Sequence, residues 1–266
     1  MINFQKELNS EQLKVVEQGV GPCLVLAGAG SGKTRTIIYR VAYLLEQGVK
    51  PENILLVTFT NKAAKEMIDR VNRLTTKSPL PPFIKGGKDP AGSGGILLPW
   101  SGTFHHIGYR ILKKYAGVMG YKNNFNVLDT DDSLELIKLC LKSEGIDRKE
   151  RFFPSAKVLQ SIISFARNAE TTIAEVLNFK YPDFLPVLDT IERIVDDYRR
   201  RKQESNVMDF DDLLVNFYLL LLKFPEIKNK YVEQFEYVLV DEYQDTNKIQ
   251  ASIIDLLASK YKNLLV

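Results

Sequence analysis

Residues 26–34 read LAGAGSGKT, and this stretch decides the fold. An apolar run, PCLVLA (22–27), enters it, and a segment with helical spacing of its apolar residues (33–48) leaves it. A glycine-rich turn between a strand and a helix lets backbone N–H groups surround phosphate oxygens at the positive end of the helix. Lys33 can then reach the β- and γ-phosphates of a nucleotide, and the Thr34 hydroxyl can bind Mg²⁺. The stretch predicts a phosphate loop.

The loop departs from the strict pattern GxxxxGK[ST] at its first position, which is Ala27 instead of glycine. The dinucleotide fingerprint GxGxxG does not fit either, because the third glycine is Gly32 and not residue 33. A fortuitous glycine-rich turn without a ligand is therefore the alternative to a phosphate loop at this point.

Strand and helix patterns alternate around the loop. An apolar strand, NILLVTF (53–59), and a helical segment (61–74) come next. The alternation resumes late in the chain with a helix (209–224), a strand (235–242), a helix (248–261) and an apolar end, NLLV (263–266). This order is typical of an α/β fold, in which crossover helices connect the strands of a parallel sheet.

Two regions interrupt the alternation. Residues 77–100 hold five of the eleven prolines and five of the sixteen glycines, a density that predicts a flexible insertion. From Phe104 to about Ser205 the chain shows helical periodicity only, in the segments 131–145, 154–170 and 186–205. We therefore expect a helical domain inserted into the α/β domain.

The stretch VLVDEYQD (238–245) places two carboxylates at the end of an apolar strand. A phosphate-loop ATPase needs a carboxylate there to hold Mg²⁺, and Asp241 has that position. Glu242, beside it, could orient and polarise the attacking water. Such a pair can instead cap the following helix. Its presence in the same chain as residues 26–34 favours the ATPase interpretation of both motifs.

Composition excludes several other classes of protein. The net charge of +3 is only weakly indicative of an acidic partner. Cys23 and Cys140 lie far apart in apolar runs without a CxxC or His/Cys cluster, so we expect reduced thiols and no zinc or iron–sulfur site. No signal peptide begins the chain, and no stretch is apolar enough to span a membrane, so we expect a cytoplasmic protein.

Taken in order, the motifs resemble the N-terminal half of superfamily 1 DNA helicases of the UvrD/Rep type. That family also has alanine at the first loop position, as at Ala27. The similar stretches are LNSEQLKVV (8–16, Q motif), AGAGSGKTR (27–35, Walker A), VTFTNKAAKEM (57–67, motif Ia), GTFHHIGYRIL (102–112, motif Ib), MDFDDLL (208–214) and DEYQDTN (241–247, motif II).

The resemblance implies a site for ATP and Mg²⁺. Gln12 would contact adenine, with Arg35 near the base and the phosphates. Lys33, Glu242 and Gln244 would be catalytic, and Gln244 would link the γ-phosphate to the rest of the motor. Thr34 and Asp241 would hold the metal. The remaining loop residues that would bind the nucleotide are Ala27, Gly28, Ala29, Gly30, Ser31 and Gly32.

The resemblance also implies that single-stranded DNA and its junctions with duplex are the partners. Phe59, Thr60 and Asn61, together with Thr103 and His105, would lie along the single strand, where rings stack on bases and polar groups hold phosphates. Without the resemblance, Phe59 would read as a core residue and His105 as a surface or capping residue. His106 is left unassigned. The basic run 199–202 at a helix end reads as a solvated face.

The resemblance implies a RecA-like motor domain formed by residues 1–109 and 206–266, with an inserted helical domain at 110–205. The chain stops in the apparent opening of a buried strand, so we expect the second motor domain, whose arginines complete the ATP site, to lie outside it. Three interpretations stay open: part of a 3′–5′ helicase, part of a helicase–nuclease subunit of the RecB/AddA type, or a nucleotide- or DNA-binding module without motor activity.

Overall fold

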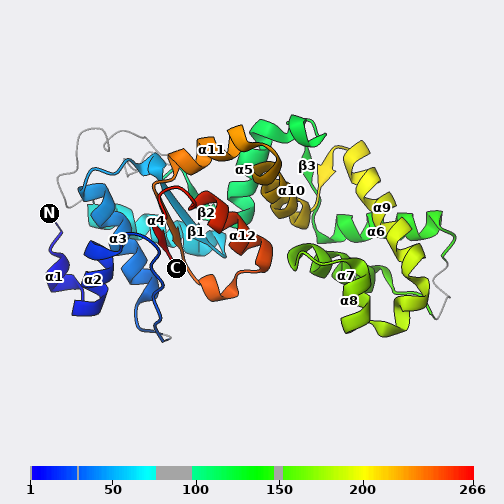
Figure 1. Cartoon of the computed structure of the whole chain (residues 1–266), viewed down its shortest axis with the longest axis horizontal. Coiled ribbons are helices and arrows are strands. Elements are labelled where there is room, and N and C mark those ends of the chain that lie inside the picture. Colours follow the sequence, from blue (N-terminus) through cyan, green and yellow to red (C-terminus); the bar gives the residue numbers. More distant parts are fainter. Residues whose placement is uncertain (1, 29, 76–97, 147–151) are drawn as a thin grey trace. The chain divides into compact units, whose positions relative to one another are not determined.

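The computed structural model describes residues 2–28, 30–75, 98–146 and 152–266 (Figure 1). Its contacts divide the chain into two compact units. Unit 1 comprises Met1–Ile107, Leu221–Thr246 and Ile253–Val266, and unit 2 comprises Gly108–Leu220 and Asn247–Ser252. The domain bounds expected above, at 109/110 and 205/206, stay a prediction.

Unit 1 is built on a parallel sheet with the strand order β2-β1-β5-β6. The strands are β1 (Ile54–Thr58), β2 (Ser101–Thr103), β5 (Tyr237–Val240) and β6 (Leu264–Leu265). The helices α1 (Phe4–Glu7), α2 (Ser10–Gln18), α3 (Lys33–Glu46), α4 (Asn61–Thr75) and α11 (Pro225–Gln234) accompany them. The expected α/β fold with a parallel sheet is confirmed.

The sheet's register aligns the ends of strands that are far apart in sequence. Every residue of β1 is buried, as its unbroken apolar sequence predicts for a strand covered on both faces. In β1, Val57 pairs with Val240 of β5, and Thr58 pairs with Thr103 of β2. The carboxyl ends of these strands therefore meet at one edge, where the residues following β1, β2 and β5 gather.

The run 22–27, predicted as a strand, is paired in the structure but is not a regular strand. Cys23 forms an isolated parallel bridge with Leu265, and the Val25 N–H donates to the Val266 carbonyl at 2.8 Å. Cys23 and Val25 pack against the core that the sheet shares with α3 and α4, while Leu24 and Leu26 are 64% and 86% exposed. The neighbouring strand β6 has two residues.

Unit 2 is helical. Its principal helices are α6 (Thr130–Ser143), α7 (Ala156–Asn168), α8 (Ile173–Lys180) and α9 (Leu188–Glu204), and their apolar faces form one core. The helices predicted at 131–145, 154–170 and 186–205 are confirmed. The sequence reasoning missed α8 and the small parallel pair of β3 (Asn126–Val127) and β4 (Val207–Met208), which are too short to give a clear periodicity.

Three helices contribute residues to both units. These are α5 (Phe104–Tyr115), α10 (Phe210–Lys223) and α12 (Lys248–Leu257). Most of the predicted insertion at 77–100 lies outside the described residues. Its described end is part of the core of unit 1, where the Trp100 ring packs edge-on against Tyr231 and Phe235, with centroids 5.5 and 5.3 Å away.

The basic run 199–202 was predicted to be a solvated face, and this is wrong for its last residue. Arg199 and Arg200 are exposed and form ion pairs within α9. Lys202 is fully buried, and its Nζ lies 2.5 Å from carboxylate oxygens of both Asp209 and Asp212. The side chain turns inward because two carboxylates at the start of α10 lie beneath this end of α9.

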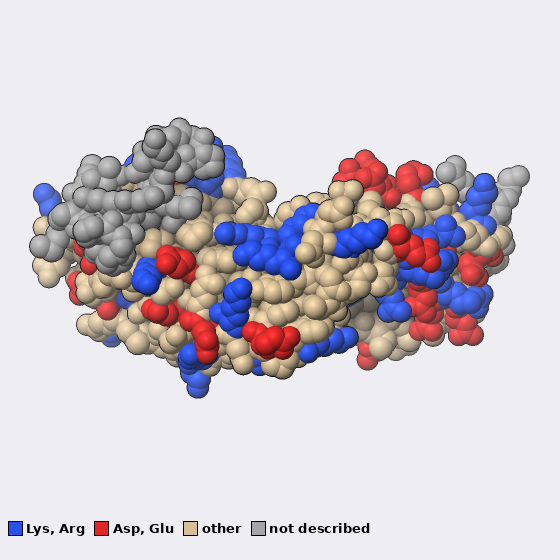
Figure 2. Space-filling model, turned by 90° about the horizontal axis from the view of Figure 1, so that it is seen from above, with Lys and Arg blue, Asp and Glu red and all other residues tan. Residues whose placement is uncertain are grey.

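The described surface carries charges of both signs. On the face drawn in Figure 2, basic and acidic side chains are interspersed at the right-hand end, where the ribbon view places the helical unit. Ion pairs such as Arg199–Asp196 and Arg193–Glu144 belong to this unit. Within the residues that the structure describes, no helix combines the length and apolarity that crossing a bilayer requires.

Candidate nucleotide-binding site

The predicted phosphate loop leads directly into α3. Gly30 and Gly32 have φ angles of +77° and +92°, and a Cβ on Gly32 would lie 2.9 Å from the Gln12 amide nitrogen. The described part of the loop supplies no side-chain cap to α3, so the N–H groups of its first turn face outward for an anion. These described features are compatible with a phosphate-binding loop.

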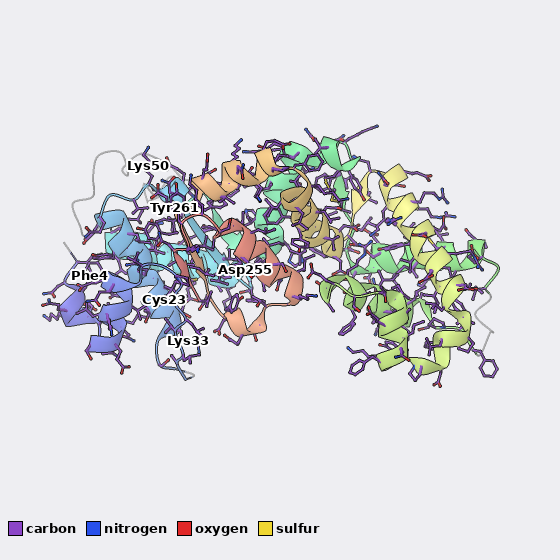
Figure 3. All side chains as sticks on the ribbon, viewed as in Figure 1. Phe4, Cys23, Lys33, Lys50, Asp255 and Tyr261 are labelled. Carbon is purple, nitrogen blue, oxygen red and sulfur yellow. The ribbon has the colours of Figure 1, made fainter. Side chains whose placement is uncertain are left out.

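Lys33, labelled in Figure 3, is the first residue of α3, and its side chain contacts the loop. Its Nζ donates a hydrogen bond to the Ala27 carbonyl at 3.0 Å. Ser31 also closes the turn, through an Oγ–H donated to the Gly28 carbonyl at 2.6 Å. The ammonium group thus spans the hollow of the loop, where a nucleotide phosphate would compete for it. Ala29, predicted to bind the nucleotide, lies outside the described residues.

Thr34, on α3, and Asp241, directly after β5, form a metal-compatible pair. The Thr34 hydroxyl donates to a carboxylate oxygen of Asp241 at 3.1 Å. Burial raises the pKa of Asp241, the Thr34 hydrogen bond lowers it, and the charge of Glu242 raises it again. A divalent cation would favour the ionised carboxylate and reduce this repulsion.

The donor set fits Mg²⁺ bound together with a nucleotide. Magnesium in such sites takes one or two protein ligands, and phosphates and water supply the rest. Among the described residues, no cluster of three or more histidine, cysteine or carboxylate groups could hold a metal by itself. The hydroxyl of Thr34 and the carboxylate of Asp241 are the ligands that the chain offers here.

Glu242 has an unusual backbone conformation at the end of β5. Its φ of +54° is in the left-handed region, which residues other than glycine rarely adopt. The Gln244 amide donates to its carboxylate at 2.5 Å, and Gln244 belongs to the 3₁₀ turn η4 (Tyr243–Asp245). Both side chains line a cavity of about 390 Å³ together with Lys33 and Asp241. The structure thus brings the three predicted catalytic residues to one cavity.

Gln12 and Arg35 have different surroundings. Gln12 is held in a capping box with Asn9 at the start of α2, and its amide donates to the Ser31 carbonyl at 3.1 Å. Arg35 instead pairs with Glu7 at 3.1 Å, and its guanidinium lies 5.1 Å from the centre of the Tyr39 ring. The structure therefore places Gln12 on the loop, and Arg35 against α1.

The residues predicted to lie along DNA gather at the carboxyl edge of the sheet. Phe59 is half-buried and packs edge-on against Phe104, with centroids 6.0 Å apart. Thr60 is exposed, and its hydroxyl accepts the Ala63 N–H at the start of α4. Asn61 is the exposed first residue of α4. The DNA-binding roles of these side chains stay predictions.

Thr103 and His105 follow at the neighbouring strand. The Thr103 hydroxyl accepts the His106 N–H at 3.2 Å, which caps α5, and His105 is half-buried. A second cavity of about 560 Å³ lies at the carboxyl edge of the sheet and reaches the Thr34–Asp241 pair. Thr58, Phe59 and Thr60 line it together with Asp241 and Glu242.

Sequence reasoning missed two residues of the site. Asp245 lines the second cavity, and its membership of the acidic motif DEYQDTN (241–247) could have revealed it. Glu7 holds Arg35 through both its carboxylate and its carbonyl oxygen. No spacing pattern signals this contact, because it depends on where α1 packs.

The chain is similar to known proteins over nearly its whole length. The family model described as "UvrD/REP helicase N-terminal domain" matches residues 8–266. The "ATP-dependent DNA helicase PcrA" of Staphylococcus epidermidis is 40% identical over 262 residues, which are 98% of this chain and 33% of that protein. The protein of the same name from Staphylococcus aureus is 38% identical over 260 residues, 97% of this chain and 32% of its own length.

The chain thus spans about a third of the length of the curated relatives that it matches. The matched family covers the phosphate loop, the acidic motif and the helical unit between them. The chain belongs to the UvrD/REP helicase N-terminal domain family.

Proposed function

We propose that this chain binds ATP with Mg²⁺ as the N-terminal part of a cytoplasmic 3′–5′ DNA helicase. The observation that carries the proposal is the Thr34–Asp241 hydrogen bond at 3.1 Å, which joins the phosphate loop to the end of β5 over 207 residues of sequence. A hydroxyl and a carboxylate in this arrangement are the protein ligands that phosphate-loop ATPases use for Mg²⁺.

Each polar group has a task in the hydrolysis of ATP. Lys33 would exchange the Ala27 carbonyl for the β- and γ-phosphates and neutralise their charge. Glu242 would orient and polarise the attacking water, and Gln244, bonded to it, would sense the γ-phosphate. Gln12 would hold adenine, and Arg35 would leave Glu7 to reach the base and phosphates. Mg²⁺, when bound, neutralises the charge that develops on the phosphate oxygens.

The carboxyl edge of the sheet would carry single-stranded DNA. The Phe59 ring can stack on a base, a contact worth about 1–3 kcal/mol by substitution. The groups for phosphates are Thr60, Asn61, Thr103 and His105. The relatives are named DNA helicases, and about two thirds of their length lies outside the matched part. A second motor domain would complete the ATP site and convert hydrolysis into movement and unwinding at DNA junctions.

Titration of the 266-residue chain with a fluorescent N-methylanthraniloyl ATP tests the nucleotide site. We expect saturable binding that tightens when Mg²⁺ is added. Lys33→Ala should weaken this binding about tenfold or more, because a hydrogen bond to a charged group is worth about 1.5–3 kcal/mol. Lys50→Ala, which changes an exposed lysine outside the site, is the matched control and should leave the affinity unchanged. Equal affinity in the two variants would refute the site.

A second substitution separates binding from chemistry. In the complete motor, Glu242→Gln should abolish ATP hydrolysis while nucleotide affinity remains within about twofold, since the amide keeps the size of the side chain but cannot act as a base. Undiminished turnover would remove Glu242 from its proposed role.

A further inference from the structure

Arg40 is a buried arginine of α3, about two helical turns after Lys33. The residue is 2% exposed, although arginine is almost never fully buried unless it is paired. Its guanidinium donates to the Val16 carbonyl at 2.5 Å and to the Gly19 carbonyl at 2.6 Å. Both acceptors belong to the C-terminal end of α2, which Gly19 caps. Arg40 therefore fastens the last turn of α2 to α3, and both helices belong to unit 1.

The charge of Arg40 suits this position. The last carbonyls of a helix carry partial negative charge, and a cation beside them stabilises the helix. The centres of the Tyr43 and Tyr237 rings lie 5.7 and 5.8 Å from the guanidinium carbon. Burial lowers the pKa of Arg40, but an arginine still keeps its proton at neutral pH. The bonds to α2 are therefore charge-assisted, which makes them stronger than bonds between neutral groups.

The opposite end of α2 carries Gln12, the residue that we propose to hold adenine. The Gln12 side-chain oxygen accepts the Asn9 N–H at 3.3 Å, and its nitrogen donates to the Ser31 carbonyl at 3.1 Å. A carboxamide has two N–H hydrogens and two lone pairs on its oxygen. Beyond these two bonds, the amide thus retains one donor hydrogen and one lone pair for a base, and the capping box fixes its orientation.

The place of Gln12 depends on how α2 lies along α3. Its amide nitrogen stands so near the phosphate loop that a Cβ on Gly32 would lie 2.9 Å away. Apolar residues such as Val16 and Tyr39 pack α2 on α3, but hydrophobic contacts are not directional. The bonds from Arg40 are directional, so they set the register between the two helices. Because α3 begins at the phosphate loop, this register decides where Gln12 lies relative to the phosphates.

We propose that Arg40 is a positioning residue for base selection: by fixing α2 on α3, it holds Gln12 where the amide distinguishes adenine from guanine. The inference rests on the proposed nucleotide function. Adenine offers a donor at N6 and an acceptor at N7, which a glutamine amide can bind together, whereas guanine has an acceptor at O6. Loss of the Arg40 contacts should therefore weaken recognition of adenine and leave the binding of phosphates by the loop unchanged.

The test compares the Mg²⁺ complexes of N-methylanthraniloyl ATP and GTP, whose dissociation constants are measured by fluorescence titration of the 266-residue chain. We expect the unaltered chain to prefer ATP about fivefold or more, as a bidentate contact to one base allows. Arg40→Lys keeps the charge, but an ammonium group lacks the fork that reaches two carbonyls. Its ATP preference should fall about threefold or more, while its GTP affinity changes less than about twofold.

Two further variants frame this result. Arg73→Lys, which changes an exposed arginine of α4 in the same unit, is the matched control and should keep the preference. Gly19→Ala disturbs the junction from α2, because a Cβ there would lie 2.6 Å from the Val15 carbonyl oxygen. The last turn of α2 must shift to admit it, so we expect the same selective loss of ATP affinity. This variant decides the test if Arg40→Lys melts below the assay temperature.

A double variant shows whether Arg40 acts through Gln12. Gln12→Ala alone should reduce the ATP preference, and adding Arg40→Lys should change the remaining preference less than about twofold, since residues that act as a unit are not additive. Independent losses that multiply would overturn the inference. An unchanged ATP preference in Arg40→Lys would also overturn it, as would equal weakening of ATP and GTP, which a general structural effect predicts.

Two results with the unaltered chain separate the inference from the proposed function. If the chain binds ATP and GTP with equal affinity, the inference fails and the proposed nucleotide site stands. If it binds neither nucleotide, the proposed function fails and the inference falls with it.

Discussion

The burial that would suit Asp241 to a metal also makes its ionised form lower the stability of the folded chain. It is 5% exposed, and it lies next to Glu242, so its ionised form is disfavoured in the folded chain. A carboxyl group whose pKa is raised on folding stabilises the fold below its unfolded pKa, and this contribution disappears as the pH rises through the folded value. At neutral pH the ionised Asp241 is therefore a cost that Mg²⁺ would offset.

Asp241→Asn should make this cost measurable. The amide is neutral at every pH, so we expect a higher melting temperature than that of the unaltered chain at pH 7, with the difference shrinking as the pH is lowered below the raised pKa of Asp241. The same variant should lose the tightening of nucleotide binding by Mg²⁺. Scanning calorimetry from pH 4 to 8 gives the first result and a titration with and without Mg²⁺ the second. A lower melting temperature at pH 7 would contradict the argument.

At the scale of the element, the end of α9 shows how one helix presents cations to two environments. Arg199 is 68% exposed on its side chain and pairs with Asp196, while Lys202, three residues later, is enclosed by Asp209, Asp212 and the ring of Tyr198. A buried ion pair is weak evidence of net stability, but removal of one partner leaves the other charge buried and uncompensated.

Lys202→Met should therefore destabilise the fold by about 3–5 kcal/mol, because both carboxylates lose a buried partner. Arg199→Met, the matched control on the exposed face of the same helix, should cost less than about 0.5 kcal/mol. Urea unfolding at neutral pH, followed by circular dichroism, measures both. Similar unfolding midpoints for the two variants would show that the cluster tolerates the loss of its cation.

Elements with a long apolar stripe were predictable from the sequence, and contacts between distant segments were not. The helices α3 and α9 and the strands β1 and β5 carry their periodicity within themselves. Whether Lys202 faces water depends on what packs beneath α9, and how far 22–27 pairs as a strand depends on its contacts with a distant segment of the chain. Neither property is encoded in the local pattern.

The candidate site divides in the same way. Lys33, Thr34, Asp241 and Glu242 stand in two contiguous motifs, and the rule that ligands gather at the carboxyl ends of parallel strands brings the motifs together. The pairing of Arg35 with Glu7 arises from helix packing, so it carries no signature of spacing.

At the scale of the whole molecule, the matched third of the relatives' length holds the residues that we propose as ligands for phosphate and Mg²⁺. The arginines of the second motor domain are expected outside it, and such arginines contribute about 10³–10⁵ in turnover in related phosphoryl transfer. We therefore expect the isolated 266 residues to hydrolyse ATP very slowly and to leave a forked DNA duplex unopened. Phosphate release with and without single-stranded DNA, beside an unwinding assay, measures both. Robust DNA-stimulated turnover would refute this expectation.

The segment before the phosphate loop pairs with β6, and this pairing affects how the chain can fold during its synthesis. The Gly21 N–H donates to the side chain of Asn263, 242 residues away, whereas the buried core shared by α6, α7, α8 and α9 joins residues between Ile137 and Tyr198. Forming such a distant contact requires closing a long loop, which slows folding. During synthesis on the ribosome, the core of α6 to α9 can become compact before β6, which pairs with the segment leading into the phosphate loop, has been made.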